Sequence, residues 1–89
     1  MPTLQTDHEI VAIITAKIGA APGTLTYDDT DRLIELGLSG LALSELPPEL
    51  WQLTNLQELD LGNNQLSQLP SDIGQLTNLQ SLDLDEAWS

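Results

Sequence analysis

The sequence predicts an α/β solenoid, in which a short array of parallel strands carries a helical cap at its N-terminal end. The motif L-x-x-L-x-L begins at Leu33, Leu56 and Leu79, always 23 residues apart. Between the motifs, a proline and several apolar residues recur at matching positions, whereas helical periodicity is found only near the N-terminus. We therefore divide the chain into a helical cap, residues 1–32, and a repeat region, residues 33–89, with two full 23-residue units and a terminal strand.

The N-terminal segment predicts a helix from about Asp7 to Ile18. Thr6 and Glu9 match the T-x-x-E capping box, whose side chains bond the free backbone amides of a helix start. Isoleucines recur at helical spacing and form one apolar face, and Gly19 is suited to end the helix. Such a helix can cover the exposed flank of the first repeat unit.

The stretch between this helix and the first repeat is rich in threonine and aspartate. We expect Thr24–Thr26 to be extended, and Thr26 with Asp29 to begin a capped helical turn. The carboxylates of "YDDTD" lack the D-x-D-x-D-G spacing and the distal glutamate of a calcium loop, so capping is preferred to calcium binding. His8, the only histidine, is expected on the surface.

Each repeat unit is predicted to contain a strand, a turn and a return segment. In "LQELDL", alternation places the leucines on a buried face and Glu58 and Asp60 on an exposed one. "GNN" then turns the chain, because Gly and Asn tolerate positive φ. Pro70 is expected to start a short helical return that Ser71–Asp72 caps. In the first unit the return carries Trp51, which we expect to be partly exposed.

The stretch "LTNLQELDLGNNQLSQLPSDIGQLTNL" resembles a leucine-rich repeat of the 23-residue, LP-containing type, found in bacterial proteins and in intracellular Ras-associated scaffolds. The resemblance extends from Leu33 to Leu84. It implies parallel strands that line a concave surface and return segments on the convex side. It also implies that the function is protein–protein recognition and not catalysis. The family's Asn position is filled by Asn64 alone, since Leu41 and Ala87 stand at the equivalent positions.

The composition excludes several classes of protein. The 89 residues carry a formal net charge of −12, and Lys17 and Arg32 are the only basic residues besides the histidine. Nucleic acid and anionic membrane surfaces are therefore excluded as partners, because both are bound through basic side chains. We expect no metal site, no cofactor and no enzyme activity, since there is no cysteine and no nucleophile–base pair or phosphate loop. Without an evident signal peptide or membrane-spanning stretch, the expected location is the cytoplasm.

Stacking of the units predicts columns of side chains on the outer face of the sheet. Equivalent positions of neighbouring strands lie about 4.8 Å apart. Asp60 and Asp83 are therefore expected side by side, at a cost in stability. Such a face is either simply solvated or suited to a protein partner with a basic surface. The predicted partner-binding residues are Glu35, Glu58, Asp60, Asn63, Asp83, Asp85 and Glu86.

The leading hypothesis is a protein–protein interaction module that uses this acidic, concave strand face. The alternatives concern the third motif, which departs from the pattern after Leu84 and is followed by no return segment. A second copy is expected to cover its open edge in a homodimer, with Leu82, Leu84 and Trp88 in the contact. The other alternative is that the chain is the N-terminal fragment of a longer protein, whose function the sequence does not reveal.

Overall fold

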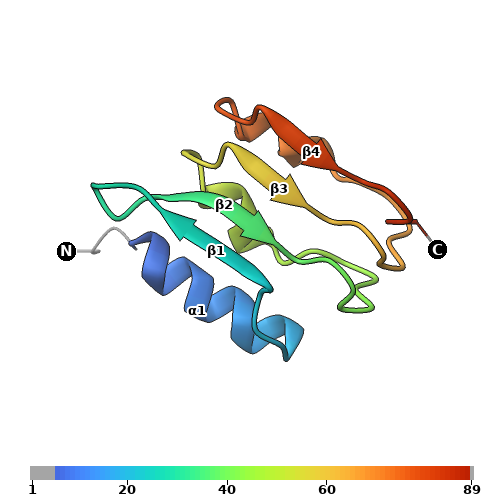
Figure 1. The fold of residues 1–89 in the computed structure, drawn as a ribbon. Coiled ribbons are helices and arrows are strands. Elements are labelled where there is room, and N and C mark those ends of the chain that lie inside the picture. Colours follow the sequence, from blue (N-terminus) through green and yellow to red (C-terminus); the bar gives the residue numbers. More distant parts are fainter. Residues whose placement is uncertain (1–5, 89) are drawn as a thin grey trace.

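The computed structural model describes residues 6–88 and contains one four-stranded sheet (Figure 1). The strands lie in the order β1-β2-β3-β4, with β1 and β2 antiparallel and the other neighbours parallel. This mostly parallel sheet is compatible with the predicted solenoid. In chain order, the elements are α1 (Asp7–Ile18), β1 (Thr24–Tyr27), β2 (Leu33–Gly37), the 3₁₀ helix η1 (Pro48–Gln52), β3 (Glu58–Asp60), the 3₁₀ helix η2 (Ser71–Gln75) and β4 (Ser81–Asp83).

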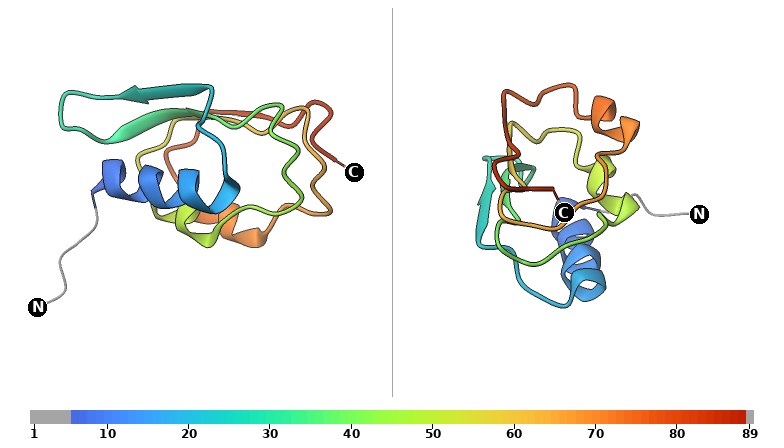
Figure 2. Two further views of the ribbon diagram at one scale, coloured as in Figure 1. Left: turned by 90° about the horizontal axis from the view of Figure 1, so that it is seen from below. Right: turned by 90° about the vertical axis from the view of Figure 1, so that its right-hand side faces the viewer.

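Helix α1 has the predicted bounds, the Thr6 half of the predicted capping box and the predicted end at Gly19. The hydroxyl oxygen of Thr6 accepts a hydrogen bond from the amide of Glu9 at 3.2 Å. At the other end, Gly19 adopts a left-handed φ of 74° and donates its amide to the carbonyl of Thr15. The helix packs against η1, on the side of the sheet where both 3₁₀ helices lie (Figure 2). Its role as a cap of the repeat array stays a prediction.

Two polar side chains of α1 join the helix to the first repeat unit. The buried carboxylate of Asp7 accepts a hydrogen bond from the amide of Leu33, the first residue of β2, at 2.7 Å. Near the other end of the helix, the ammonium of Lys17 donates to both carboxylate oxygens of Glu49 in η1, at 2.9 and 2.8 Å. The helix is therefore anchored at both of its ends by charge-assisted hydrogen bonds.

The extended conformation predicted for residues 24–26 is confirmed, but the capped helical turn predicted after it is wrong. Thr26 lies inside β1, which pairs with β2 as a hairpin. The chain reverses in a turn in which one carboxylate oxygen of Asp28 accepts the amides of Thr30 and Arg32, at 2.8 and 3.0 Å. Aspartate at this position therefore stabilises a hairpin turn, a use of Asp that competes with helix capping.

The core is aliphatic and runs between the sheet and the 3₁₀ helices. The leucines of the first two repeat motifs are at most 2% exposed. Trp51 corrects our expectation of partial exposure, because it is only 4% exposed. The physical reason is that η1 packs against α1, so that Leu50 and Trp51 are both covered. Trp51 therefore supplies a large apolar side chain to a core without phenylalanine.

The return segments begin at prolines, as predicted, but not with the predicted side-chain caps. Pro47 and Pro70 stand at the position before η1 and η2, and no side chain caps either 3₁₀ helix. Ser71 and Asp72 lie inside η2, so the capping role predicted for them is wrong. The fixed φ of proline suffices to direct the chain into these short turns.

Candidate functional site

The outer side chains of β2, β3 and β4 form the surface that we call the strand face. In the observed register Glu35 pairs with Glu58, and Glu58 with Ser81. In the adjacent column Gly37 pairs with Asp60, and Asp60 with Asp83. The columns predicted from the 23-residue spacing are therefore present. The strand face consists of Glu35, Gly37, Glu58, Asp60, Ser81 and Asp83.

The strand face is hollowed beside β1, the edge strand that pairs with β2. A depression of about 230 Å³ is lined by the carboxylates of both columns and by Thr24 of β1. Gly37 leaves room here for β1, because a Cβ atom at this position would lie 2.9 Å from the Cβ of Thr24. The first unit therefore lacks the aspartate that the other two units carry, and β1 forms one wall of the depression.

Asp60 and Asp83 each make a local hydrogen bond that the columns alone did not predict. One carboxylate oxygen of Asp60 accepts the amide of Gly62, and one of Asp83 accepts the amide of Asp85, both at 2.9 Å. Each bond fixes the turn that follows its strand, as an Asp side chain commonly does. It uses one oxygen of the carboxylate, so the second oxygen is available to a ligand.

The remaining predicted binding residues lie in these turns. Asn63 and Glu86 are exposed, and their backbone adopts the left-handed conformation, with φ of 53° and 60°. The equivalent residue of the first unit is Gly40, with φ of 70°. Asp85 is exposed beside them, and its carbonyl oxygen would lie 2.9 Å from a Cβ atom at Gly62. The structure thus places four of the seven predicted binding residues on the strand face and the other three in the adjacent turns, and their role in binding stays a prediction.

Positive charge is scarce around the strand face. Lys17 is bonded to Glu49 on η1, and neither Lys17 nor Arg32 lines the depression. Within residues 6–88, no group of three or more histidine, aspartate or glutamate side chains is arranged to hold a metal ion. The carboxylates of the strand face are therefore compensated neither by basic residues of the depression nor by a recognisable metal site in this part of the chain.

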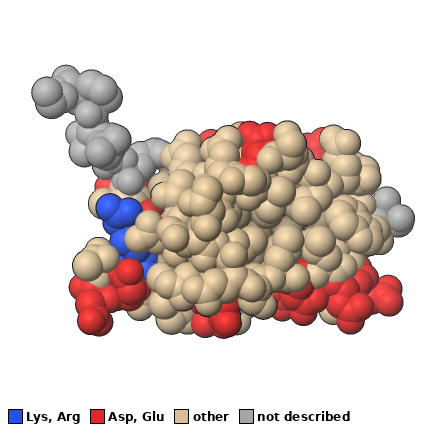
Figure 3. Space-filling model, turned by 90° about the horizontal axis from the view of Figure 1, so that it is seen from above, with Lys and Arg blue, Asp and Glu red and all other residues tan. Residues whose placement is uncertain are grey.

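The residues predicted for self-association lie at the β4 edge. Leu82 and Leu84 are half-buried, and Trp88 is 48% exposed while its backbone forms a parallel bridge with Leu66. Figure 3 views the molecule from this side, and acidic residues lie mainly around the margin of a broad uncharged area. The last unit therefore presents a largely uncharged flank in which its leucines are incompletely covered.

A comparison with protein families identifies a related family. The sequence model for the leucine rich repeat matches residues 31–86, which is more than half of the chain. The chain belongs to the leucine-rich repeat family. No curated protein and no solved structure matches it significantly. Leucine-rich repeats generally mediate protein–protein interaction and are typically not enzymes. Among the described residues, no helix is long and apolar enough to cross a membrane.

The single asparagine of the leucine-rich repeat pattern joins the first two units. The buried side chain of Asn64 accepts the amides of Leu41 and Leu43, at 3.1 and 3.0 Å. Its amide group donates to the carbonyls of Leu38, Leu61 and Gly62, at 2.9 to 3.0 Å. Asn64 thus satisfies backbone groups in two successive turns.

In the last leucine-rich repeat unit, backbone carbonyls take the place of an asparagine side chain. Ala87, at the equivalent position, is fully buried. The amide of Asn64 donates to the carbonyl of Glu86 at 3.1 Å, and the amide of Leu66 donates to that of Ala87 at 2.8 Å. These two amides of the second unit are therefore satisfied without the side chain that the family pattern provides.

Sequence reasoning missed the contribution of β1 to the site. Thr24 forms a wall of the depression, and the hydroxyl of Thr26 donates to a carboxylate oxygen of Glu35 at 2.9 Å. The available signal was Gly37, because a glycine replaces the aspartate found at this position in both later units. Loss of a side chain in a strand often marks the close approach of another backbone.

Proposed function

We propose that this leucine-rich repeat chain binds a protein partner with a basic surface through its strand face. The observation that carries this proposal is the stacking of Glu35 on Glu58 and of Asp60 on Asp83 around one depression without basic residues. Like charges directly opposite each other in a sheet are destabilising. A partner's lysine or arginine side chains would relieve this repulsion and would also be attracted from a distance by the net charge of −12.

The test separates the strand face from the overall negative charge. Asp60→Asn with Asp83→Asn removes two charges but keeps an oxygen that can accept the turn amides. Asp29→Asn with Asp72→Asn removes the same charge at exposed positions outside the strand face. The probe is acetyl-(Arg-Gly)₄-amide, and its affinity for the three proteins is measured by calorimetry at low and at moderate salt.

We expect the Asp60→Asn/Asp83→Asn protein to bind the peptide about five- to tenfold more weakly than the unmodified chain, as the loss of two charge contacts implies. The Asp29→Asn/Asp72→Asn protein should lose no more than about twofold. Equal weakening in both double variants would show that the peptide senses only net charge, and the strand-face proposal would fail.

A second candidate function is self-association through the flank of the last unit. Its leucines remain half-buried, whereas the equivalent leucines of the second unit are at most 2% exposed. A second copy that covers this flank would complete their burial. The residues concerned are Leu79, Leu82, Leu84 and Trp88.

Light scattering between about 10 µM and 1 mM tests this candidate, a range that spans weak to moderate dimers. The mass should rise towards that of a dimer, and Trp88→Ser should weaken the association. Leu25→Ser is the matched control, because Leu25 is also a large apolar residue that is exposed, at 41%, and it lies on β1, away from this flank. A monomeric mass at every concentration would rule out the homodimer.

A further inference from the structure

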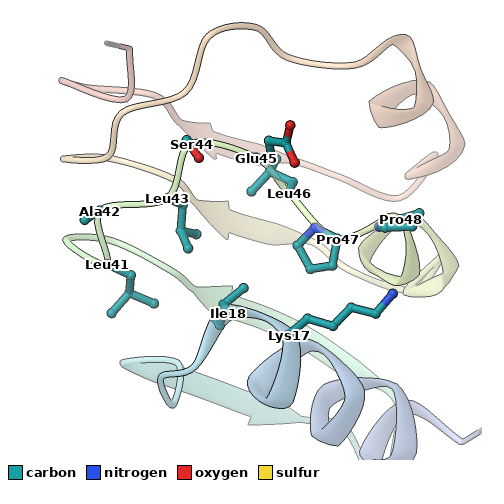
Figure 4. A pocket seen from close by; sticks show the side chains of 10 residues that line it. All are labelled: Lys17, Ile18, Leu41, Ala42, Leu43, Ser44, Glu45, Leu46, Pro47 and Pro48. Atoms are coloured by element: carbon teal, nitrogen blue, oxygen red, sulfur yellow. The ribbon is translucent and has the colours of Figure 1, made fainter.

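A second hollow on the surface lies away from the strand face. It is a groove of about 420 Å³ between the last turn of α1 and the segment 41–48, which leads from β2 to η1 (Figure 4). We define this groove by Ile18 on α1 and by Leu41, Leu43 and Leu46 on the opposite wall. Its volume falls within the range of about 300–1,000 Å³ that is typical of binding pockets.

The groove exists because α1 covers only part of the first unit. The helix ends at Ile18, where Gly19 turns the chain away. Leu41 stands 23 residues before Asn64, so the first unit has an aliphatic side chain where the second has a buried, hydrogen-bonded amide. Ile18 and Leu41 are half-buried as a result. Apolar side chains are therefore left partly exposed at this groove, on a chain of net charge −12.

The charges around the groove favour a ligand that carries a basic residue next to its apolar side chains. Lys17 lies at one end, but both oxygens of Glu49 accept hydrogen bonds from its ammonium. Glu45 stands on the opposite wall, is exposed, and turns its carboxylate outward in Figure 4. No hydrogen bond or ion pair of the described residues engages the Glu45 carboxylate. The rim therefore carries one paired cation and one uncompensated anion.

We propose that this groove binds an apolar side-chain pair of a protein partner, with a lysine or arginine beside it that contacts Glu45. The apolar side chains would bury Ile18, Leu41 and Leu46, and the basic residue would compensate the carboxylate. This surface is separate from the strand face, so a partner can use it independently of the proposed function.

The test uses three tetrapeptides and the carbon-13 methyl signals of the groove residues. Acetyl-KLLK-amide carries the proposed features, acetyl-KSSK-amide lacks the apolar side chains, and acetyl-ELLE-amide reverses the charge. Saturable shifts of the Ile18, Leu41 and Leu46 methyl signals are expected with KLLK, with at least about fivefold weaker binding of the other two peptides.

Two pairs of variants separate the groove from general effects. Glu45→Lys and Asp72→Lys change the net charge equally, but only Glu45 lines the groove. We expect about fivefold weaker binding of KLLK by Glu45→Lys, and less than a twofold change for Asp72→Lys. Leu41→Asn should abolish the shifts, whereas Leu25→Asn, on exposed β1, should leave them in place.

Four results would overturn the groove proposal. The first is that KSSK or ELLE binds as tightly as KLLK. The second is that Glu45→Lys and Asp72→Lys change the affinity for KLLK equally. The third is that the groove methyl signals do not shift in a saturable way. Shifts confined to the strand face would also overturn it, and would leave the proposed function standing. If Leu41→Asn fails to fold, the exposed Glu45→Lys still decides between these results.

Discussion

Asn64 is the residue on which the junction between the first two units most depends. Its side chain makes five hydrogen bonds to backbone groups of two turns and is only 6% exposed. An alanine at this position would leave several of those groups buried without a partner. Each such group carries a desolvation cost of about 1–3 kcal/mol. The cost of the substitution is therefore that of several orphaned groups, and not of one lost bond.

Asn64→Ala is expected to lower the free energy of unfolding by about 3–5 kcal/mol, measured by urea denaturation. Asn78→Ala is the control, because the exposed Asn78 donates one hydrogen bond, to the carbonyl of Thr54 at 3.0 Å. We expect that control to cost no more than about 1 kcal/mol. Similar losses in both variants would show that Asn64 is not the principal link between the two turns.

Glu86 occupies a backbone conformation that suits glycine better. Its φ of 60° lies in the left-handed region, where a Cβ atom costs about 1–2 kcal/mol. Glu86→Gly should therefore raise the free energy of unfolding by about 1 kcal/mol, after allowance for the greater entropy of glycine in the unfolded chain. Glu86→Ala removes the same charge but keeps the Cβ atom. Equal stabilisation by both variants would assign the gain to charge and contradict the conformational explanation.

Among the elements, β1 is the one that most changes the site. It adds an antiparallel strand to a parallel sheet and approaches Gly37 closely enough to exclude a side chain. Gly37→Asp would restore the aspartate of the other units, but its Cβ atom would clash with Thr24. We expect a loss of about 1–3 kcal/mol in the free energy of unfolding.

A double-mutant cycle with Thr24→Gly tests this explanation. Because Thr24→Gly removes the Cβ and hydroxyl groups nearest to Gly37, Gly37→Asp should cost clearly less in that background. The comparison uses urea denaturation of the four proteins. An unchanged cost would mean that crowding by β1 does not explain the glycine.

The link between α1 and η1 has a measurable effect on one carboxyl group. The hydrogen bonds from the Lys17 ammonium hold the pKa of Glu49 below its usual value of 4.5. A lowered pKa means that this link stabilises the folded state above pH 4.5 and that the contribution is lost as the pH falls through the folded-state value. Lys17→Met should return the pKa of Glu49 towards 4.5, measured by carbon-13 NMR titration. A pKa that does not move would show that the link is not formed in solution.

The sequence predicted helix α1 and the strand register, because both depend on patterns within short stretches of the chain. The bounds of α1 follow from a capping threonine, a glycine and the isoleucine spacing, and the strand register follows from the 23-residue period. The pairing of β1, the burial of Trp51 and the role of Asp28 depend on contacts between distant segments or on the choice between two uses of the same side chain. The groove at Leu41 could not be predicted, because it depends on how much of the first unit α1 covers.

For the molecule as a whole, acidity is distributed unevenly over three surfaces. The strand face gathers stacked carboxylates, the groove carries one uncompensated glutamate at its rim, and the flank beside β4 has a broad uncharged area (Figure 3). A basic partner, an apolar peptide with a basic neighbour, and a second copy are therefore expected at different places. The binding site of each partner can be located by the residues that become protected from solvent when the partner binds.

The central proposal is that the strand face binds a basic protein surface, and the most direct measurement maps where a basic ligand lies on the unmodified chain. Nitrogen-15 NMR spectra are recorded during titration with acetyl-(Arg-Gly)₄-amide. We predict that the largest saturable shifts occur at Glu35, Glu58, Asp60 and Asp83. Shifts of equal size at Asp29 and Asp72, or shifts that leave the four strand-face residues unchanged, would contradict the proposal.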